Sequence, residues 1–135
     1  MRILVVEDSK TSRMYLLEIL KTITSKNTTT DYAVSGEEAL AKYETSITSG
    51  EGYDLIFMDI ILPGIDGLQT LEKIRNFEQK NGWSEEQKSK VIITSVVDDE
   101  IKVSRAFFQC GAISYMTKPI TADKIKSEMN KFGLI

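Results

Sequence analysis

The stretch that decides the fold runs from Tyr53 to Gly67 and reads YDLIFMDIILPGIDG. Its four consecutive apolar residues, Leu55 to Met58, predict a strand buried on both faces, as the central strand of a parallel sheet is. The strand ends on a carboxylate, Asp59, and a proline and two glycines then mark a loop that leads into a helix. An aspartate at the carboxyl end of such a strand lies where open α/β sheets bind ligands. On its own, Asp59 fits a turn-forming residue equally well.

The composition is that of an ordinary globular domain. The 135 residues are 41% hydrophobic and 27% charged, with a formal net charge of -3, and we expect one domain over residues 1–135. No run of lysine and arginine offers a face for nucleic acid. No apolar run approaches the roughly 20 residues that span a bilayer. The single cysteine, Cys110, excludes an internal disulfide, so we expect a cytoplasmic protein in a reducing compartment.

The absence of histidine narrows the chemistry further. Without histidine the chain has no Ser-His or Cys-His nucleophile and no histidine ligand for zinc. The remaining groups are carboxylates, hydroxyls and lysines, which are the partners of Mg²⁺ and of phosphoryl groups.

Short apolar runs alternate with helical patterns along the chain, which predicts an α/β fold with a doubly wound, five-stranded parallel sheet. The expected strands are Arg2–Val6, Thr29–Val34, Leu55–Met58, Val91–Ile93 and Ile113–Thr117. Helices are expected over residues 10–24, from 36 past 43, from 67 past 75, from 98 to 111 and from 121 to 132.

Two of these helices have apolar stripes from which inward-facing residues can be predicted. In the first helix we expect Met14, Leu17 and Leu20 to face the core, with Tyr15 and Ile19 beside them. In the fourth, which we expect to begin at Asp98-Asp99-Glu100, the inward residues are Val103, Ala106 and Phe107.

Four of the five expected strands end in groups that suit cation or phosphate chemistry, namely Glu7 with Asp8, Asp59, Thr94 and Lys118. The carboxyl ends of parallel strands share one edge of the sheet, so we expect these side chains to converge. Clustered carboxylates repel unless a divalent cation neutralises them, and Mg²⁺ prefers oxygen ligands. Asp59 is placed to attack phosphorus, while Lys118 and the Thr94 hydroxyl are suited to hold phosphoryl oxygens. The competing explanation for Glu7 and Asp8 is that they only stabilise the amino end of the following helix.

With these motifs in view, the chain resembles the receiver domain of bacterial two-component response regulators. The resemblance covers essentially the whole chain and rests on the Glu7-Asp8 pair, the segment from Asp59 to Gly67, Thr94 followed by Ser95, and the segment from Gly111 to Pro119. It implies a flavodoxin-like (βα)5 sheet with strand order 2-1-3-4-5.

The resemblance also implies a role for each site residue. Asp59 would be the phosphorylated residue, and Thr94 and Lys118 would hold the phosphoryl group. Mg²⁺ would be bound by Asp8, Asp59 and the backbone carbonyl of Ile61, with Glu7 acting through water. Tyr115 would be a switch residue that turns inward as Thr94 moves, and the Lys118–Pro119 bond would be cis.

Partners also follow from the resemblance. The donor would be a sensor histidine kinase or a histidine phosphotransfer protein, and the face made by the fourth helix, fifth strand and fifth helix would switch affinity for a downstream protein. We expect a signalling switch and not an enzyme acting on other substrates. We also expect a stand-alone receiver, similar to chemotaxis regulators, with no attached effector domain.

Some positions depart from the usual pattern. Glu7 stands where aspartate is more frequent, Leu62 stands where methionine is usual, and the connection from Asn81 to Lys90 is long. Within that connection we expect Trp83 to cover local apolar surface, with a contact to a partner as the second possibility.

Three other functions compete with the phospho-acceptor switch. A phosphorelay intermediate that passes the phosphoryl group onward shares all of its residues. A flavin- or nucleotide-binding protein on the same sheet needs a phosphate-binding loop after the first strand, where this chain has the acids Glu7 and Asp8. A phosphatase or phosphomutase with an aspartate nucleophile usually needs a second carboxylate two residues later, where Ile61 stands.

Overall fold

A computed structural model describes residues 1–96 and 99–135 of the chain. Parallel strands form one sheet in the order β2-β1-β3-β4-β5, which confirms the predicted fold class and strand order. The strands are β1 (Arg2–Val6), β2 (Thr29–Ala33), β3 (Leu55–Met58), β4 (Lys90–Ser95) and β5 (Ser114–Thr117). The helices are α1 (Lys10–Ile23), α2 (Gly36–Thr48), α3 (Gly67–Lys80), α4 (Glu100–Ser104), the π-helical turn η1 (Arg105–Gln109) and α5 (Ala122–Lys131).

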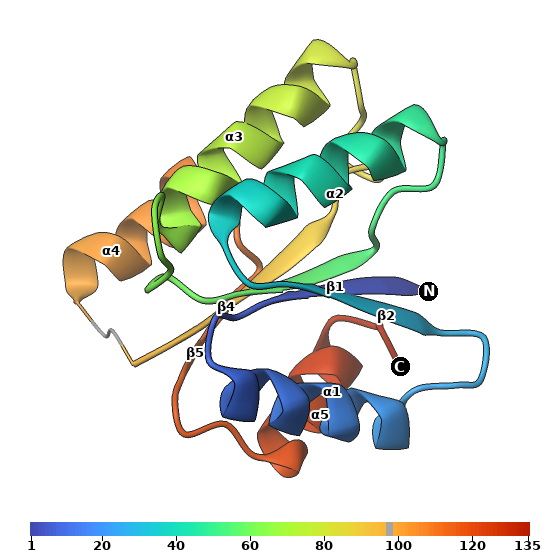
Figure 1. Cartoon of the computed structure of the whole chain (residues 1–135), viewed down its shortest axis with the longest axis vertical. Coiled ribbons are helices and arrows are strands. Elements are labelled where there is room, and N and C mark those ends of the chain that lie inside the picture. Colours follow the sequence, from blue (N-terminus) through green and yellow to red (C-terminus); the bar gives the residue numbers. More distant parts are fainter. Residues whose placement is uncertain (97–98) are drawn as a thin grey trace.

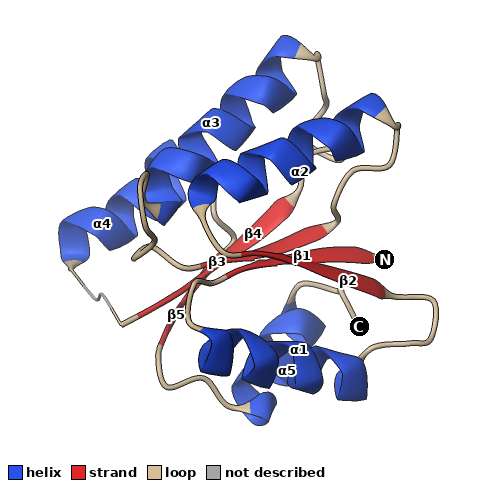
Figure 2. Cartoon of the chain, in the orientation of Figure 1, coloured by secondary structure: helices blue, strands red, loops and turns tan. Residues whose placement is uncertain are grey.

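Helices cover both faces of the sheet (Figure 1). The helices α2, α3 and α4 lie on one face, and α1 and α5 lie on the other, as Figure 2 also shows. This layering explains why β3 is apolar at every position, because successive side chains of a strand point to opposite faces. In β3, Ile56 and Met58 join the cluster under α2 and α3, while Leu55 and Phe57 join the cluster under α1 and α5.

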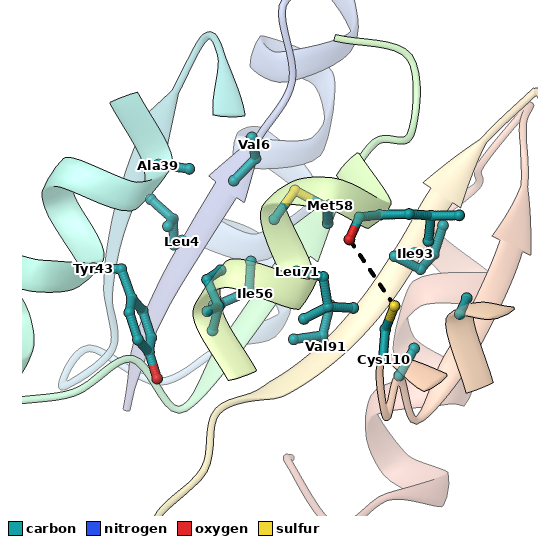
Figure 3. Close-up of a cluster of buried hydrophobic side chains, with 14 of the residues drawn as sticks. Leu4, Val6, Ala39, Tyr43, Ile56, Met58, Leu71, Val91, Ile93 and Cys110 are labelled. Carbon is teal, nitrogen blue, oxygen red and sulfur yellow. Dashed lines mark hydrogen bonds between the residues drawn. The ribbon is translucent and has the colours of Figure 1, made fainter. Parts of the chain in front are cut away.

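Figure 3 shows the larger of the two clusters, where β1, β3 and β4 meet the helices above them. Leu71 of α3 lies over the sheet, and the Cys110 thiol is directed at the backbone carbonyl of Leu68 at 4.0 Å. Burial raises the pKa of this thiol above its usual value, as expected for an inert cysteine in a core.

The first helix presents only part of the predicted stripe to the core, because Ile19 and Leu20 are buried and Leu17 packs against the core as expected, but Met14 and Tyr15 do not. Met14 and Tyr15 are 54% and 53% exposed, while Leu16, Ile19 and Leu20 are buried. The prediction was wrong for Met14 and Tyr15, because the four successive apolar residues from Met14 to Leu17 allow more than one helical stripe. The sheet selects the stripe that begins at Leu16, since its members pack on the α1 side of β1 and β3.

The fourth helix also differs from the prediction, and its predicted start at Asp98 lies outside the described residues. Ala106 and Cys110 are buried as a regular helix requires, but Phe107 is 37% exposed. The cause is the π-helical turn, in which the amide of Cys110 donates to the carbonyl of Arg105, five residues earlier. The wider turn moves Phe107 off the inward stripe.

The long connection between α3 and β4 is anchored by a buried carboxylate that the sequence patterns did not reveal. Glu78 is fully buried and accepts hydrogen bonds from the Tyr43 hydroxyl at 2.7 Å, from Arg75 at 2.7 Å and from the Ser89 amide at 2.8 Å. Trp83 lies against Gly52, in the loop before β3, because a Cβ atom built on Gly52 would meet the indole ring at 3.0 Å. Trp83 therefore lies at the amino ends of the strands.

Candidate functional site

The predicted site residues lie at the carboxyl ends of the strands, at the edge of the sheet opposite Trp83. Glu7 and Asp8 follow β1, Asp59 follows β3 and Lys118 follows β5. The ammonium group of Lys118 lies between two acids, donating a hydrogen bond to Oε1 of Glu7 and one to Oδ2 of Asp59 at 2.9 Å. Three separate strand ends thus meet in one ion-paired cluster.

Lys118 is the cation that compensates these carboxylates in the metal-free chain. Burial alone lowers the pKa of a lysine, but the hydrogen bonds to Glu7 and Asp59 outweigh it and raise the pKa of Lys118 above its usual value. The ammonium is therefore charged and fixed in place at neutral pH. The sequence predicts that Lys118 holds phosphoryl oxygens, and in the structure its ammonium donates to the carboxylates of Glu7 and Asp59.

Glu7 shows that one ammonium is not enough for this cluster. Its residue is 5% exposed, and across the described parts of the chain its Oε2 is the one buried side-chain polar atom without a hydrogen-bond partner. The pKa of Glu7 is raised from 4.5 to about 7, chiefly by burial and also by the neighbouring Asp59, against the lowering effect of Lys118. A buried carboxylate with a free oxygen is costly unless a donor or a cation reaches it.

The donor set fits a hard divalent cation. Glu7, Asp8 and Asp59 each offer one carboxylate oxygen, and these oxygens lie within 4.8 Å of one another. Glu7 and Asp59 are buried, and Asp8 is exposed at the mouth of the cluster. Oxygen ligands with several negative charges suit Mg²⁺, and the unpartnered Glu7 oxygen shows that the protein alone leaves this cluster incompletely compensated.

The loop after β3 is held tightly against the acceptor strand. Gly67 begins α3 so close to the end of β3 that a Cβ atom there would lie 2.0 Å from the backbone oxygen of Asp59. The amide of Ile61 donates to Oδ1 of Asp59 at 3.1 Å, which orients the carboxylate. A capping box between Asp66 and Gln69 fixes the start of α3. The loop therefore has little freedom where Asp59 is attached.

A cavity of about 430 Å³ opens beside the cluster, on the α1 side. Its polar lining includes Glu7, Thr94 and Lys118, so Thr94 borders the same cavity as the ion pair between Lys118 and Glu7. The apolar lining comes from α1 and from the segment after β5, including Tyr15, Leu16, Val96, Pro119 and Ile120. The peptide bond between Lys118 and Pro119 is cis, as the resemblance implied.

Two further predictions concern Tyr115 and the carbonyl of Ile61. Tyr115 is partly buried and packs against the cluster under α2 and α3. Its role as a switch, and the carbonyl of Ile61 as a metal ligand, stay predictions.

Sequence reasoning missed two residues that fasten the loops of the site. The guanidinium of Arg13 donates to the backbone carbonyl of Glu7, and the carboxylate of Glu37 accepts from the amide of Ile65 in the loop after β3. The hydrogen bond from Ile65 lowers the pKa of Glu37. Neither residue stands at a strand end, so the pattern that found the other residues could not find these.

Comparisons with known proteins agree with this geometry. A family model described as the response regulator receiver domain matches residues 3–130, and the chain belongs to this family. The CheY chemotaxis protein of Treponema pallidum is 34% identical over 125 residues, covering 92% of this chain and 76% of that protein. The match is to receivers, so it does not favour a flavin-binding or nucleotide-binding protein.

The family also occurs within larger proteins. Hybrid signal transduction histidine kinase L of Dictyostelium discoideum is 34% identical over 134 residues, which cover 98% of this chain but 7% of the kinase. Among solved structures, the CheX-CheY-BeF3-Mg²⁺ complex of Borrelia burgdorferi matches with a TM-score of 0.78 and 26% identity, over 97% of this chain and 88% of that one. In the described part of the chain, no helix has the length and apolar character that crossing a membrane requires.

Proposed function

We propose that Asp59 accepts a phosphoryl group from a phosphohistidine on a sensor histidine kinase or a histidine phosphotransfer protein. The 135 residues contain no histidine, so the phosphohistidine lies outside them. The observation that carries the proposal is the contact between Lys118 and Oδ2 of Asp59 at 2.9 Å. The same ammonium also donates to Glu7, whose carboxylate is buried.

The side chains suit an in-line displacement at phosphorus. A carboxylate oxygen of Asp59 attacks the phosphorus, the phosphorus–nitrogen bond of the phosphohistidine breaks, and the departing imidazole keeps the electron pair and takes up a proton. In this mechanism Lys118 moves from the carboxylates to a phosphoryl oxygen, and Thr94 donates its hydroxyl to another. The Ile61 amide, already bonded to Asp59, keeps the attacking carboxylate oriented.

The residues that would hold Mg²⁺ are Asp8, Asp59 and the backbone carbonyl of Ile61, with Glu7 acting through a water molecule. A bound Mg²⁺ supplies positive charge that neutralises the clustered carboxylates and the oxygens of the incoming phosphoryl group. The free oxygen of Glu7 supports this assignment, because no group in the described parts of the chain donates a hydrogen bond to it.

The output is a change in affinity for a downstream protein. In this proposal Thr94 moves toward the phosphoryl group, Tyr115 turns inward, and the face formed by α4, β5 and α5 changes shape. The chain acts on itself alone, gaining and losing one phosphoryl group, and works as a signalling switch. The Borrelia CheY in complex with CheX, BeF3 and Mg²⁺ supports a protein as a binding partner.

A phosphorelay role uses the same residues and differs in the final acceptor. The similarity to hybrid signal transduction histidine kinases of Dictyostelium discoideum supports it, because three such kinases match at least 96% of this chain with 32–34% identity. In this version the phosphoryl group leaves Asp59 for a histidine of another protein.

The test of the proposed function is intact mass spectrometry after incubation with a small-molecule phosphodonor. The unmodified chain should gain one phosphoryl group when Mg²⁺ is present and should gain none in a chelator. An Asp59→Asn protein that takes up phosphoryl groups at the unmodified rate would refute the assignment.

A further inference from the structure

We propose that Arg13 is a positioning residue for the metal site, holding the backbone that carries Glu7 and Asp8 in the geometry that binds Mg²⁺. This inference rests on the proposed function, because it concerns the same site. Arg13 supplies no ligand atom, and its effect passes through two backbone carbonyls.

Both the backbone and the side chain of Arg13 fasten the loop between β1 and α1. The amide of Arg13 donates to the carbonyl of Ser9 at 2.9 Å, which begins the helix. Its Nη1 atom reaches back and donates to the carbonyl of Glu7 at 3.1 Å and, more weakly, to that of Asp8 at 3.5 Å. The two acids of the loop are therefore tied to the rigid first turn of α1.

The guanidinium of Arg13 is itself held in place by an aromatic ring. Its Cζ atom lies 4.9 Å from the centroid of the Tyr32 ring, and Lys42 of α2 lies 5.1 Å from the same centroid. Lys42 also forms an ion pair with Asp31 of β2 at 3.0 Å. The Tyr32 ring is therefore held in place by contacts from both α2 and β2. The backbone amide of Glu7 donates to the carbonyl of Ala33, the β2 residue after Tyr32, at 3.0 Å. The loop is thus braced against β2 by one backbone contact and one side-chain contact.

The charge of Arg13 and its carbonyl contacts predict opposite changes in Mg²⁺ affinity when Arg13 is removed. A guanidinium near a cation site repels the cation, so the loss of its charge alone makes Mg²⁺ bind more tightly. The loss of the two carbonyl contacts frees the loop that carries Glu7 and Asp8, which makes Mg²⁺ bind more weakly. Groups that orient metal ligands typically contribute about tenfold or more to affinity, and we expect the positioning effect to dominate.

The chain contains a matched control at the other end of the sheet. Arg2 lies 4.7 Å from the centroid of the Tyr53 ring and donates to the backbone carbonyls of Glu51 and Gly52. This is the same kind of arginine–tyrosine–carbonyl contact, but it lies at the amino ends of the strands. Arg2→Met removes such a contact without touching the loop that carries the acids.

The experiment is titration of the full chain with Mg²⁺ by isothermal calorimetry, with folding of each variant checked by circular dichroism. Arg13→Met should weaken Mg²⁺ binding about tenfold, and Arg13→Lys should also weaken it, because an ammonium keeps the charge but lacks the planar guanidinium that lies over the Tyr32 ring. Tyr32→Leu should act in the same direction, and adding it to Arg13→Met should change little, since the ring acts through the guanidinium. Arg2→Met should bind Mg²⁺ as the unmodified chain does.

Mg²⁺ binding by Arg13→Met that equals or exceeds that of the unmodified chain would overturn the positioning role while leaving the metal site intact. Equal weakening by Arg2→Met would overturn it as well, because the effect would then be general. Failure of the unmodified chain to bind Mg²⁺ would overturn the proposed site, and this inference with it.

Discussion

Replacing Glu7 by glutamine should stabilise the metal-free chain at alkaline pH. The carboxylate of Glu7 is buried and has one oxygen without a partner. Its pKa rises from 4.5 in water to about 7 in the fold, chiefly through burial. The folded chain therefore keeps a proton between these two pH values that the unfolded chain has lost, and the free energy of unfolding falls as pH rises through the window.

The difference between the two pKa values lowers the free energy of unfolding by about 3 kcal/mol once the pH exceeds about 7. Glutamine keeps the shape and an acceptor for Lys118 but has no charge to bury. In a chelator at about pH 8, Glu7→Gln should therefore unfold with a free energy about 2–3 kcal/mol higher than the unmodified chain. At about pH 4, where Glu7 is protonated in both the folded and the unfolded chain, the two should be nearly equal.

Urea denaturation followed by circular dichroism measures this difference, with Glu44→Gln as the control for loss of one exposed carboxylate. Added Mg²⁺ should stabilise the unmodified chain more than Glu7→Gln at about pH 8, because the buried charge then has a compensating cation. A Glu7→Gln chain that is less stable than the unmodified chain in chelator at alkaline pH would refute this explanation of the raised pKa.

Three further predictions concern lifetime, reporting and stability. Ile61 and Val96 are 53% and 62% exposed beside the site and offer no hydrogen bond to an attacking water, so the phosphorylated chain should be long-lived. An Ile61→Asn/Val96→Glu chain, still folded, should lose its phosphoryl group faster in Mg²⁺. Equal rates of loss would exclude shielding of the phosphoryl group by these two side chains. Trp83 lies at the opposite edge of the sheet, so its fluorescence should change little with Mg²⁺; strong quenching would contradict its placement. Glu78→Ala leaves Arg75 and Tyr43 without their buried acceptor and should cost about 3–5 kcal/mol in urea denaturation, whereas a cost under about 1 kcal/mol would show that the network is not stabilising.

The architecture and most of the site could be predicted because they depend on patterns that the sheet imposes. A strand buried on both faces, such as β3, must be apolar throughout, and a polar residue that ends it must lie at the carboxyl edge. The convergence of Glu7, Asp59 and Lys118 follows from that topology alone. The strand order came from the resemblance to receivers and is confirmed by the register of the sheet.

Other features depend on packing that no short pattern encodes. The sequence offers several stripes in α1, and contact with β1 and β3 selects the one with Leu16 over the one with Met14. The π-helical turn that exposes Phe107 has no signature in a helix period. The contact of Arg13 with the carbonyl of Glu7 joins a helix to a loop through a side chain, and only the fold brings the two together.

The central claim is that Asp59 is the residue that receives the phosphoryl group. The most direct test is to phosphorylate the chain with a small-molecule donor and Mg²⁺, reduce it with borohydride, and sequence the peptides by mass spectrometry. Borohydride converts an aspartyl phosphate to homoserine, so we expect homoserine at position 59 and aspartate there when Mg²⁺ is withheld. Homoserine at Asp8 or another position, or phosphorylation that leaves residue 59 as aspartate, would contradict it.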